Sequence, residues 1–309
     1  MQRNTLGKTG IEVSPLCIGT SPLANMGSLY GYEVTDARAV ATIRSVFDSG
    51  INFLDTSNGY GEDGIAERRV GMAIRENGGL PDDFILQTKV DPDPETRDYS
   101  GARVRASVEE SLDRLGIEHL PILALHDPEF MEQDGFAPGG ALEALVAIRD
   151  AGIADHLAVA SGSVEVSQRY LDTGEFDVVL NHNRFTLLNR EAQGLFERAR
   201  AAGLGVLNAA PYGGGMLAKG PEQQPKYCYD ERDDAFADAA FAMAEACKRA
   251  GVPLIAAALQ FSVRSPLVDS TVVGVSRPER VGQTLDLLEV QIPESLWEEL
   301  ETLVPDARI

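Results

Sequence analysis

The stretch Gly50-Ile51-Asn52-Phe53-Leu54-Asp55-Thr56-Ser57-Asn58-Gly59-Tyr60-Gly61 gives the clearest indication of the fold. In it an apolar strand-like run ends in an acid, and a tyrosine follows between two glycines. An acidic side chain at the end of a buried strand costs free energy unless it is paired or used. Two later apolar runs end in the same way, at Lys89 and at His126. The strand ends of a parallel barrel meet at one mouth, where its chemistry lies. We therefore expect these four polar side chains to lie together.

Strand-like runs alternate with amphipathic stretches at intervals of roughly 30 residues, which is typical of βα units. One stretch, 102–115, places four apolar residues on one helical face. Eight such units predict a (β/α)8 TIM barrel, and 309 residues fit one barrel domain that covers 1–309. The predicted strands are residues 16–20, 51–56, 84–90, 121–127, 156–161, 176–182, 205–210 and 268–275.

A doubly wound open sheet is the alternative fold. It would favour a G-x-G-x-x-G fingerprint in its first βα turn. The sequence there is Gly19-Thr20-Ser21-Pro22, which lacks that spacing. The barrel is therefore preferred.

Three additions to a bare barrel are expected. Residues 5–13 predict an N-terminal β-hairpin around a glycine-bearing turn. A long polar loop, 211–234, follows the seventh strand, and loops of that length are usually functional or mobile. An extra C-terminal helix is predicted over 293–303, where a proline opens an amphipathic pattern.

The charge balance of the sequence limits the kinds of partner that the protein can bind. With 27 basic and 48 acidic residues the net charge is −21, which disfavours nucleic acid and anionic membranes. The three cysteines, Cys17, Cys228 and Cys247, form no disulfide framework and favour a reducing compartment. No signal peptide or long apolar run is present, so a cytoplasmic location is expected.

The four strand-end residues suggest proton transfer. A phenol ionises near pH 10, and a neighbouring cation lowers that value. Lys89 can supply the cation next to Tyr60, and Asp55 can hold the ammonium group charged and oriented. His126 can hydrogen-bond a substrate oxygen. The sequence contains no G-x-S-x-G elbow and no H-E-x-x-H ligand pair, so neither a serine nucleophile nor a metal is expected.

The chain resembles the aldo-keto reductase family from end to end. The resemblance rests on residues 6–14, on 50–61 with its continuation to Gly71, and on the short stretches 88–90 and 125–126. It implies that the four strand-end residues form the family's catalytic tetrad. It also implies hydride transfer to or from a nicotinamide cofactor, with Tyr60 as the general acid or base.

The same resemblance implies where NADP or NAD binds. The adenine end would lie at the helix that follows the eighth strand, where Arg280 stacks on adenine or pairs with a 2′-phosphate. Gln283 and Thr284 stand where many relatives have Glu and Asn, so both cofactors remain open, with a slight preference for NADP. The implied cofactor-binding residues are Gly19, Thr20, Asp55, Ser161, Tyr212, Gly214, Ser276, Arg277, Arg280 and Gln283.

Three positions depart from the family pattern around the nicotinamide ring. The Ser-Asn pair that commonly holds the carboxamide appears as Ser161 followed by glycine. Ala209 replaces the stacking aromatic residue, and the usual glutamine on the sixth strand is replaced, at Asn181-His182. Ser163 or Asn181 could take over the carboxamide contact.

The run His126-Asp127-Pro128 and the stretches 174–180 and 184–188 resemble a branch of sugar 1-dehydrogenases and pyridoxal dehydrogenases. This implies a small-molecule substrate, a sugar or a small aldehyde. Two other functions remain open. One is a non-catalytic, cofactor-binding regulatory barrel subunit. The other is a lyase that uses Lys89 as a Schiff base, against which the nearby Asp55 argues.

Overall fold

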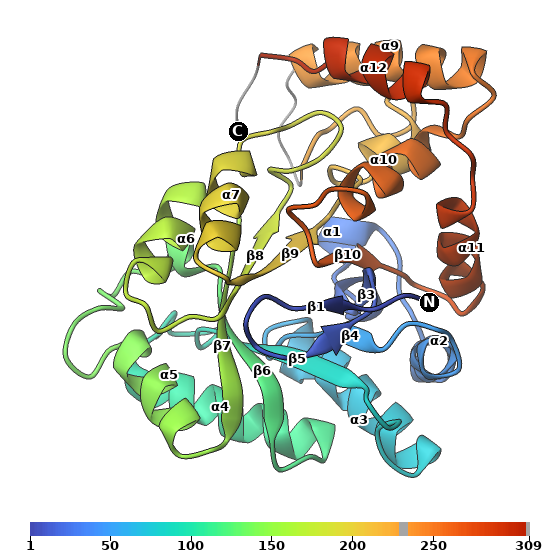
Figure 1. Ribbon diagram of the computed structural model, residues 1–309. Coiled ribbons are helices and arrows are strands. Elements are labelled where there is room, and N and C mark those ends of the chain that lie inside the picture. The colour runs from blue at the N-terminus through green and yellow to red at the C-terminus, as the bar shows by residue number, and fades with distance from the viewer. Residues whose placement is uncertain (229–233, 307–309) are drawn as a thin grey trace.

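Eight parallel strands close into a barrel at the centre of the computed structural model, which describes residues 1–228 and 234–306 (Figure 1). Each predicted strand corresponds to one of them, so the (β/α)8 barrel is confirmed and the open sheet is excluded. Their order around the barrel is β10-β3-β4-β5-β6-β7-β8-β9, and β9 pairs with β10 to close it. The strands are β3 (Leu16–Gly19), β4 (Phe53–Asp55), β5 (Ile85–Val90), β6 (Leu120–His126), β7 (Ala154–Ser161), β8 (Val178–His182), β9 (Gly205–Ala209) and β10 (Ser270–Gly274).

Helices surround the barrel and connect its strands (Figure 1). Several begin where the sequence supplies a capping hydroxyl: Thr35, Ser100 and Ser163 each accept a hydrogen bond from a backbone N–H in the first turn. The α-helices are α1 (Gly27–Tyr30), α2 (Asp36–Phe47), α3 (Ile65–Asn77), α4 (Gly101–Leu115), α5 (Ala141–Asp150), α6 (Val164–Leu171), α7 (Gln193–Ala201), α8 (Met216–Lys219), α9 (Asp234–Arg249), α10 (Leu254–Val263), α11 (Glu279–Leu288) and α12 (Glu294–Thr302). Short 3₁₀ turns are η1 (Ser21–Leu23), η2 (Glu62–Gly64) and η3 (Pro128–Phe130).

The strand pattern determines which side chains enter the barrel. Side chains alternate between the two faces of a strand. One cluster of buried residues contains strand and hairpin residues but no helix residue, and it fills the barrel. Phe53 and Ala124 belong to it, and by the same alternation Asp55, Lys89 and His126 also point inward. Because these three lie at or near the carboxyl ends of their strands, they share one mouth of the barrel.

The N-terminal hairpin closes the opposite end. Its two short strands, β1 (Asn4–Thr5) and β2 (Glu12–Val13), pair antiparallel as predicted. Leu6 and Val13 are fully buried and join the cluster inside the barrel. The hairpin therefore seals the amino-terminal end and leaves the other end for chemistry.

Several helices that follow β9 in the chain form a second layer outside the barrel. Helices α9 and α12 lie side by side, across the top of Figure 1, and share a second apolar cluster with α8 and α10. Helix α12 is the predicted C-terminal helix. The segment predicted as one long loop over 211–234 contains the four-residue α8, and its residues 229–233 lie outside the described part.

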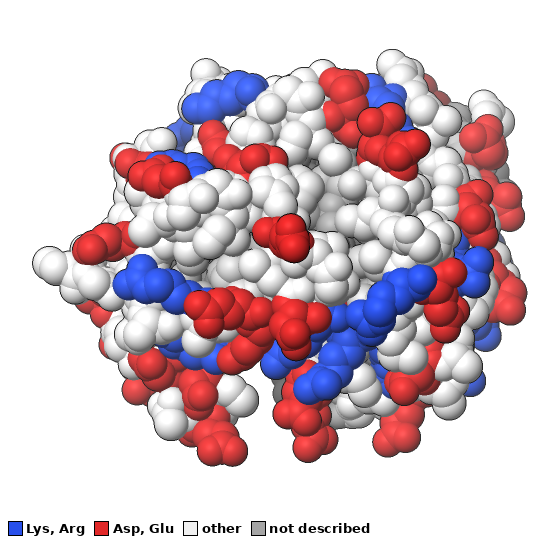
Figure 2. All heavy atoms as spheres, turned by 90° about the horizontal axis from the view of Figure 1, so that it is seen from below, with Lys and Arg blue, Asp and Glu red and all other residues white. Residues whose placement is uncertain are grey.

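Acidic side chains are spread over the whole of the face that Figure 2 shows. Basic side chains on this face lie partly scattered and partly in a short diagonal strip that acidic side chains flank. The net charge of the protein is −21. Within residues 1–228 and 234–306, no helix combines the length and the apolarity that crossing a bilayer would require.

Candidate active site

Lys89 is the centre of the polar group at the barrel mouth. Its Nζ donates to Asp55 Oδ2 at 2.7 Å, to the carbonyl oxygen of Thr56 at 2.8 Å and to Tyr60 Oη at 3.0 Å. The side chains of Lys89 and Asp55 are only 1% and 5% exposed. An ammonium group has three N–H donors, and all three are used. The position of the charge next to the Tyr60 phenol is therefore fixed.

The carboxylate of Asp55 is held from both sides. Its Oδ1 accepts from Gln87 Nε2 at 2.7 Å, while Oδ2 faces Lys89. The backbone N–H of Thr20 donates to the carbonyl oxygen of Asp55, and the Thr20 hydroxyl donates to Thr56. The end of β3 and the end of β4 are thus joined beneath the tetrad.

Two glycines place Tyr60 over the mouth. The N–H of Gly59 donates to Asp91 Oδ2 at 2.7 Å, and a Cβ at this position would lie 2.7 Å from the Asp91 carboxyl carbon. Gly61 has a φ of +80°, and a Cβ there would collide with the carbonyl oxygen of Ala24. No side chain fits at either position, so only glycine allows the loop that carries Tyr60 to follow this backbone path.

His126, the fourth predicted catalytic residue, is oriented by Asp91, a carboxylate that the sequence pattern does not single out. Its Nδ1 lies 2.6 Å from Asp91 Oδ1 and 3.0 Å from Ser57 Oγ. The Ser57 hydroxyl donates to the other oxygen of Asp91. The imidazole ring meets the Tyr60 ring edge-on, with centroids 5.4 Å apart. The structure therefore brings all four predicted catalytic residues together and adds Asp91 to them.

The electrostatics of this pair favour a charged imidazole. Burial alone would lower the pKa of His126, but the carboxylates of Asp91 and Asp127 outweigh it and raise that pKa. Burial would raise the pKa of Asp91, but His126 outweighs it and that pKa is lowered. A carboxylate at Nδ1 requires a proton on that nitrogen. Only the cationic ring then also carries a proton on Nε2, where it can donate to a substrate oxygen.

A cavity of about 370 Å³ opens over these residues. All four predicted catalytic residues line it. A second hollow of about 500 Å³, lined by residues such as Arg190 and Asp306, contains none of the four predicted catalytic residues. The other residues around the catalytic cavity are Gly19, Ser21, Pro22, Met26, Leu29, Tyr30, Gly59, Asp127, Ala160, Leu180, His182, Ala209, Ala210, Val272 and Gly274.

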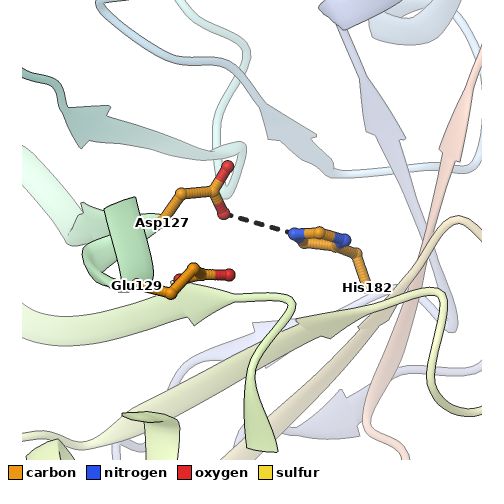
Figure 3. Close-up of side chains that lie close together, drawn as sticks. All are labelled: Asp127, Glu129 and His182. Atoms are coloured by element: carbon orange, nitrogen blue, oxygen red, sulfur yellow. Dashed lines mark hydrogen bonds and ion pairs between the residues drawn. The ribbon is translucent and has the colours of Figure 1, made fainter. Parts of the chain in front are cut away.

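Asp127 and His182 form the polar side of this cavity. Asp127 Oδ1 accepts from His182 Nε2 at 3.2 Å, and Asp127 Oδ2 lies 3.7 Å from His126 Nε2. Burial alone would raise the pKa of Asp127, but the two histidines hold it well below its usual range. Figure 3 shows Asp127 and Glu129, from the segment after β6, facing His182 from β8.

Ser161, predicted to touch the cofactor, hydrogen-bonds a carboxylate of the chain itself. Its hydroxyl donates to Glu129 Oε2 at 2.7 Å. The other oxygen of Glu129 accepts from the backbone N–H of Gly162 at 2.7 Å and of Ser163 at 3.2 Å. Glu129 gave no signal in the sequence, because it lies in the short turn η3 and only the fold brings it to the end of β7.

Asn181 offers an acceptor beside the cavity. Its Nδ2 donates to the carbonyl oxygen of Ser161 at 2.9 Å. Its Oδ1 is buried and has no hydrogen-bond partner among the described residues. Its neighbours Leu180 and His182 line the cavity, whereas Asn181 itself lies just behind the cavity wall. A buried amide oxygen of this kind suits an N–H₂ donor such as a nicotinamide carboxamide. The residues present therefore fit the ring end of the predicted cofactor.

The predicted phosphate-binding residues lie at the start of α11 and in the turn after β9. Arg277 and Arg280 are exposed, and neither forms an ion pair with any residue in 1–228 or 234–306. Burial raises the pKa of Tyr212, and the charge of Arg280 opposes that rise, so the two side chains lie near each other. Ser276 precedes α11 and Gln283 lies in its second turn. Gly214, with a φ of +65°, lies two residues after Tyr212. In an acidic protein these two arginines provide the local positive charge that an anion needs.

Comparison with known proteins agrees with this geometry. Residues 15–305 match the sequence model of the aldo/keto reductase family. A D-threo-aldose 1-dehydrogenase from a Pseudomonas species is 31% identical, over 94% of this chain and 94% of that protein. An L-galactose dehydrogenase from Arabidopsis thaliana is 31% identical over 98% and 92%, and a pyridoxal 4-dehydrogenase from Microbacterium luteolum is 28% identical over 97% of each chain.

The fold has a solved counterpart. An aldo-keto reductase from Bacillus halodurans, determined in its holo form, superposes with a TM-score of 0.81. The match covers 99% of this chain and 97% of that one at 22% identity, so it supports the barrel alone. Together with the family match and the two relatives at 31% identity, these observations establish that the chain belongs to the aldo/keto reductase family.

Proposed function

We propose that this protein transfers a hydride between a nicotinamide cofactor and a sugar or small aldehyde, as an NAD(P)-dependent aldose 1-dehydrogenase of the aldo/keto reductase family. The observation that carries the proposal is the triple contact of Lys89 Nζ with Asp55, Thr56 and Tyr60 at the cavity floor. It places a fixed positive charge beside the Tyr60 phenol, which lines the cavity. Such a pair can take up or release a proton near neutral pH.

Each tetrad residue has a defined part. In the oxidative direction the Tyr60 oxygen accepts the proton of the substrate hydroxyl, and in reduction it returns that proton. Lys89 stabilises the phenolate form, and Asp55 keeps the ammonium group charged and in place. His126 Nε2 holds the reacting oxygen. The nicotinamide, when bound, takes or supplies the hydride.

The cofactor would lie along one side of the mouth. Arg280, assisted by Ser276, Arg277 and Gln283, would hold the adenine end and a 2′-phosphate, which gives NADP a slight advantage. The other predicted residues would contact the diphosphate and the nicotinamide end of the cofactor. The diphosphate would lie against Tyr212 and Gly214, and the nicotinamide end against Gly19, Thr20, Asp55, Asn181 and Ser161.

The substrate class rests on two supports. The relatives described above bear the names of dehydrogenases for D-threo-aldoses, L-galactose and pyridoxal. The cavity of about 370 Å³ lies within the usual size range of small-molecule sites and combines a polar side with apolar residues such as Met26 and Leu29. A cytoplasmic location, where both cofactors are present, completes the proposal.

The test is reduction of NAD⁺ and NADP⁺ by the purified protein with a panel of L-fucose, D-arabinose, L-galactose, other aldoses and pyridoxal. We expect turnover of at least one aldose with a preference for one cofactor. If no member of the panel is oxidised, aldehyde reduction with NADPH is measured next. Failure in both directions would contradict the proposed oxidoreductase.

A further inference from the structure

Two carboxylates, Asp55 and Asp127, line the described cavity, and Asp55 is already paired with Lys89. Asp127 follows His126 directly, and a left-handed backbone with φ of 42° turns the chain there from β6 into η3. Its Oδ2 is 3.7 Å from His126 Nε2, the atom that would hold the reacting oxygen. A group bound by Asp127 must therefore belong to the part of the substrate next to the reacting carbon.

The carboxylate of Asp127 has one oxygen available to a ligand. Oδ1 accepts from His182 Nε2 at 3.2 Å. Oδ2 is too far from His126 for a hydrogen bond, and no other described residue donates to it. An ionised carboxylate can only accept hydrogen bonds, so the matching ligand group is a donor. In a neutral sugar that donor is a hydroxyl.

The neighbours of Asp127 fix its direction. One N or O atom each of Asp127, Glu129 and His182 lies within 4.8 Å of the others (Figure 3). Glu129 accepts hydrogen bonds from Ser161, Gly162 and Ser163, which hold its carboxylate at the start of α6. Repulsion from this second carboxylate and the bond to His182 favour the orientation of Asp127 toward the cavity, which both Asp127 and His182 line.

We infer that Asp127 is a specificity-determining residue that binds the hydroxyl group on the carbon next to the reacting carbon. This inference rests on the proposed function. It names the substrate class as 2-hydroxy aldehydes and their cyclic forms, the aldoses, and it excludes 2-deoxy sugars and simple aldehydes as good substrates. A substrate without that hydroxyl leaves the Asp127 oxygen without a donor in a site that water can no longer fill freely.

The experiment compares kcat/KM for D-arabinose and for 2-deoxy-D-ribose, which is the same pentose without the C2 hydroxyl. The reductive counterpart uses NADPH with glycolaldehyde and acetaldehyde. Both pairs are measured with the wild type, with Asp127→Asn and with Asp113→Asn, which makes the same change on the exposed face of α4. The readout is the ratio of kcat/KM within each pair, so an effect of the substitution on His126 cancels.

We expect the wild type and Asp113→Asn to share one preference for the hydroxylated substrate, and Asp127→Asn to reduce it about 10- to 100-fold. The same ratio in wild type and Asp127→Asn, with turnover present, would overturn the inference and leave the proposed function intact. No turnover of all four substrates by the wild type would overturn the function and the inference with it. Activity that is lost with EDTA and restored by a divalent cation would assign the cluster to metal binding and also overturn the inference.

Discussion

Asp91 Oδ1 lies 2.6 Å from His126 Nδ1, and both side chains are largely buried at the barrel mouth. The carboxylate is held in turn by Ser57 and by the N–H of Gly59, so it has a single orientation. His126 is thereby fixed with one ring nitrogen toward Asp91 and the other toward the cavity. Asp91 acts through His126 and is a positioning residue.

Replacement of Asp91 should change the pH dependence of the reaction. The carboxylate raises the pKa of His126, and only the cationic ring donates from Nε2. In the wild type the rate of carbonyl reduction should fall at high pH as His126 loses this proton. In Asp91→Asn the fall should move to lower pH. It is measured as the pH profile of kcat/KM, with Asp113→Asn as the control. An unchanged profile, or an unchanged NMR titration of the His126 ring, would contradict the positioning role.

The same pair makes a defined contribution to stability. Because the pKa of His126 is higher in the folded than in the unfolded protein, its protonation stabilises the fold below about pH 6.5. This stabilisation is lost as the pH rises through the pKa of His126 in the folded protein. Because the pKa of Asp91 is lower in the folded than in the unfolded protein, its ionisation stabilises the fold above about pH 4. This stabilisation is lost as the pH falls through the pKa of Asp91 in the folded protein. The unfolding free energy lost in Asp91→Asn should therefore be greatest between those limits.

Removal of only one partner of the buried ion pair between Lys89 and Asp55 should strongly destabilise the protein. Lys89→Met leaves a buried carboxylate without its cation, and we expect about 3–5 kcal/mol of destabilisation and no turnover. The double variant with Asp55→Asn as well should recover most of the stability, because no buried charge remains, but none of the activity. Urea denaturation and steady-state rates measure the two effects. Recovery of turnover in the double variant would refute the role of Lys89.

Arg280 should discriminate between the two cofactors. If it pairs with a 2′-phosphate, Arg280→Ala weakens NADP binding by about 10- to 100-fold, since a charged hydrogen-bonded contact is lost. NAD binding should change little. Fluorescence titration gives both dissociation constants without turnover. An equal loss for both cofactors would place Arg280 at the adenine ring, away from the phosphate.

Asn52 should matter for stability and not for chemistry. At the sealed end of the barrel its Nδ2 donates to the carbonyl oxygens of Glu12 and Asp83, and its Oδ1 accepts from the N–H of Ser14. Asn52→Ala should lower the free energy of unfolding by about 2–4 kcal/mol, because buried backbone groups lose their partners. Asn77→Ala, at an exposed helix end, is the matched control. A large change in KM with unchanged stability would show that Asn52 acts on the site.

Much of this arrangement could be predicted from strand periodicity. The alternation of side chains fixes that Asp55, Lys89 and His126 face the interior, and the apolar runs locate the strand ends. Asp91 was missed because it lies beyond the end of β5, where alternation no longer determines direction. Glu129 was missed for a related reason. Its partners at the end of β7 come from over thirty residues away, and only the closed barrel brings them together.

Single-turnover hydride transfer in Tyr60→Phe tests directly whether the Tyr60 oxygen transfers the proton. The substitution removes only the phenolic oxygen that Lys89 contacts at 3.0 Å, and Tyr32→Phe makes the same change on an exposed side chain. We expect Tyr60→Phe to lower the rate of the chemical step by about 10²- to 10⁴-fold, with cofactor binding nearly unchanged. Tyr32→Phe should behave as the wild type. A Tyr60→Phe enzyme that transfers hydride at the wild-type rate would contradict the account.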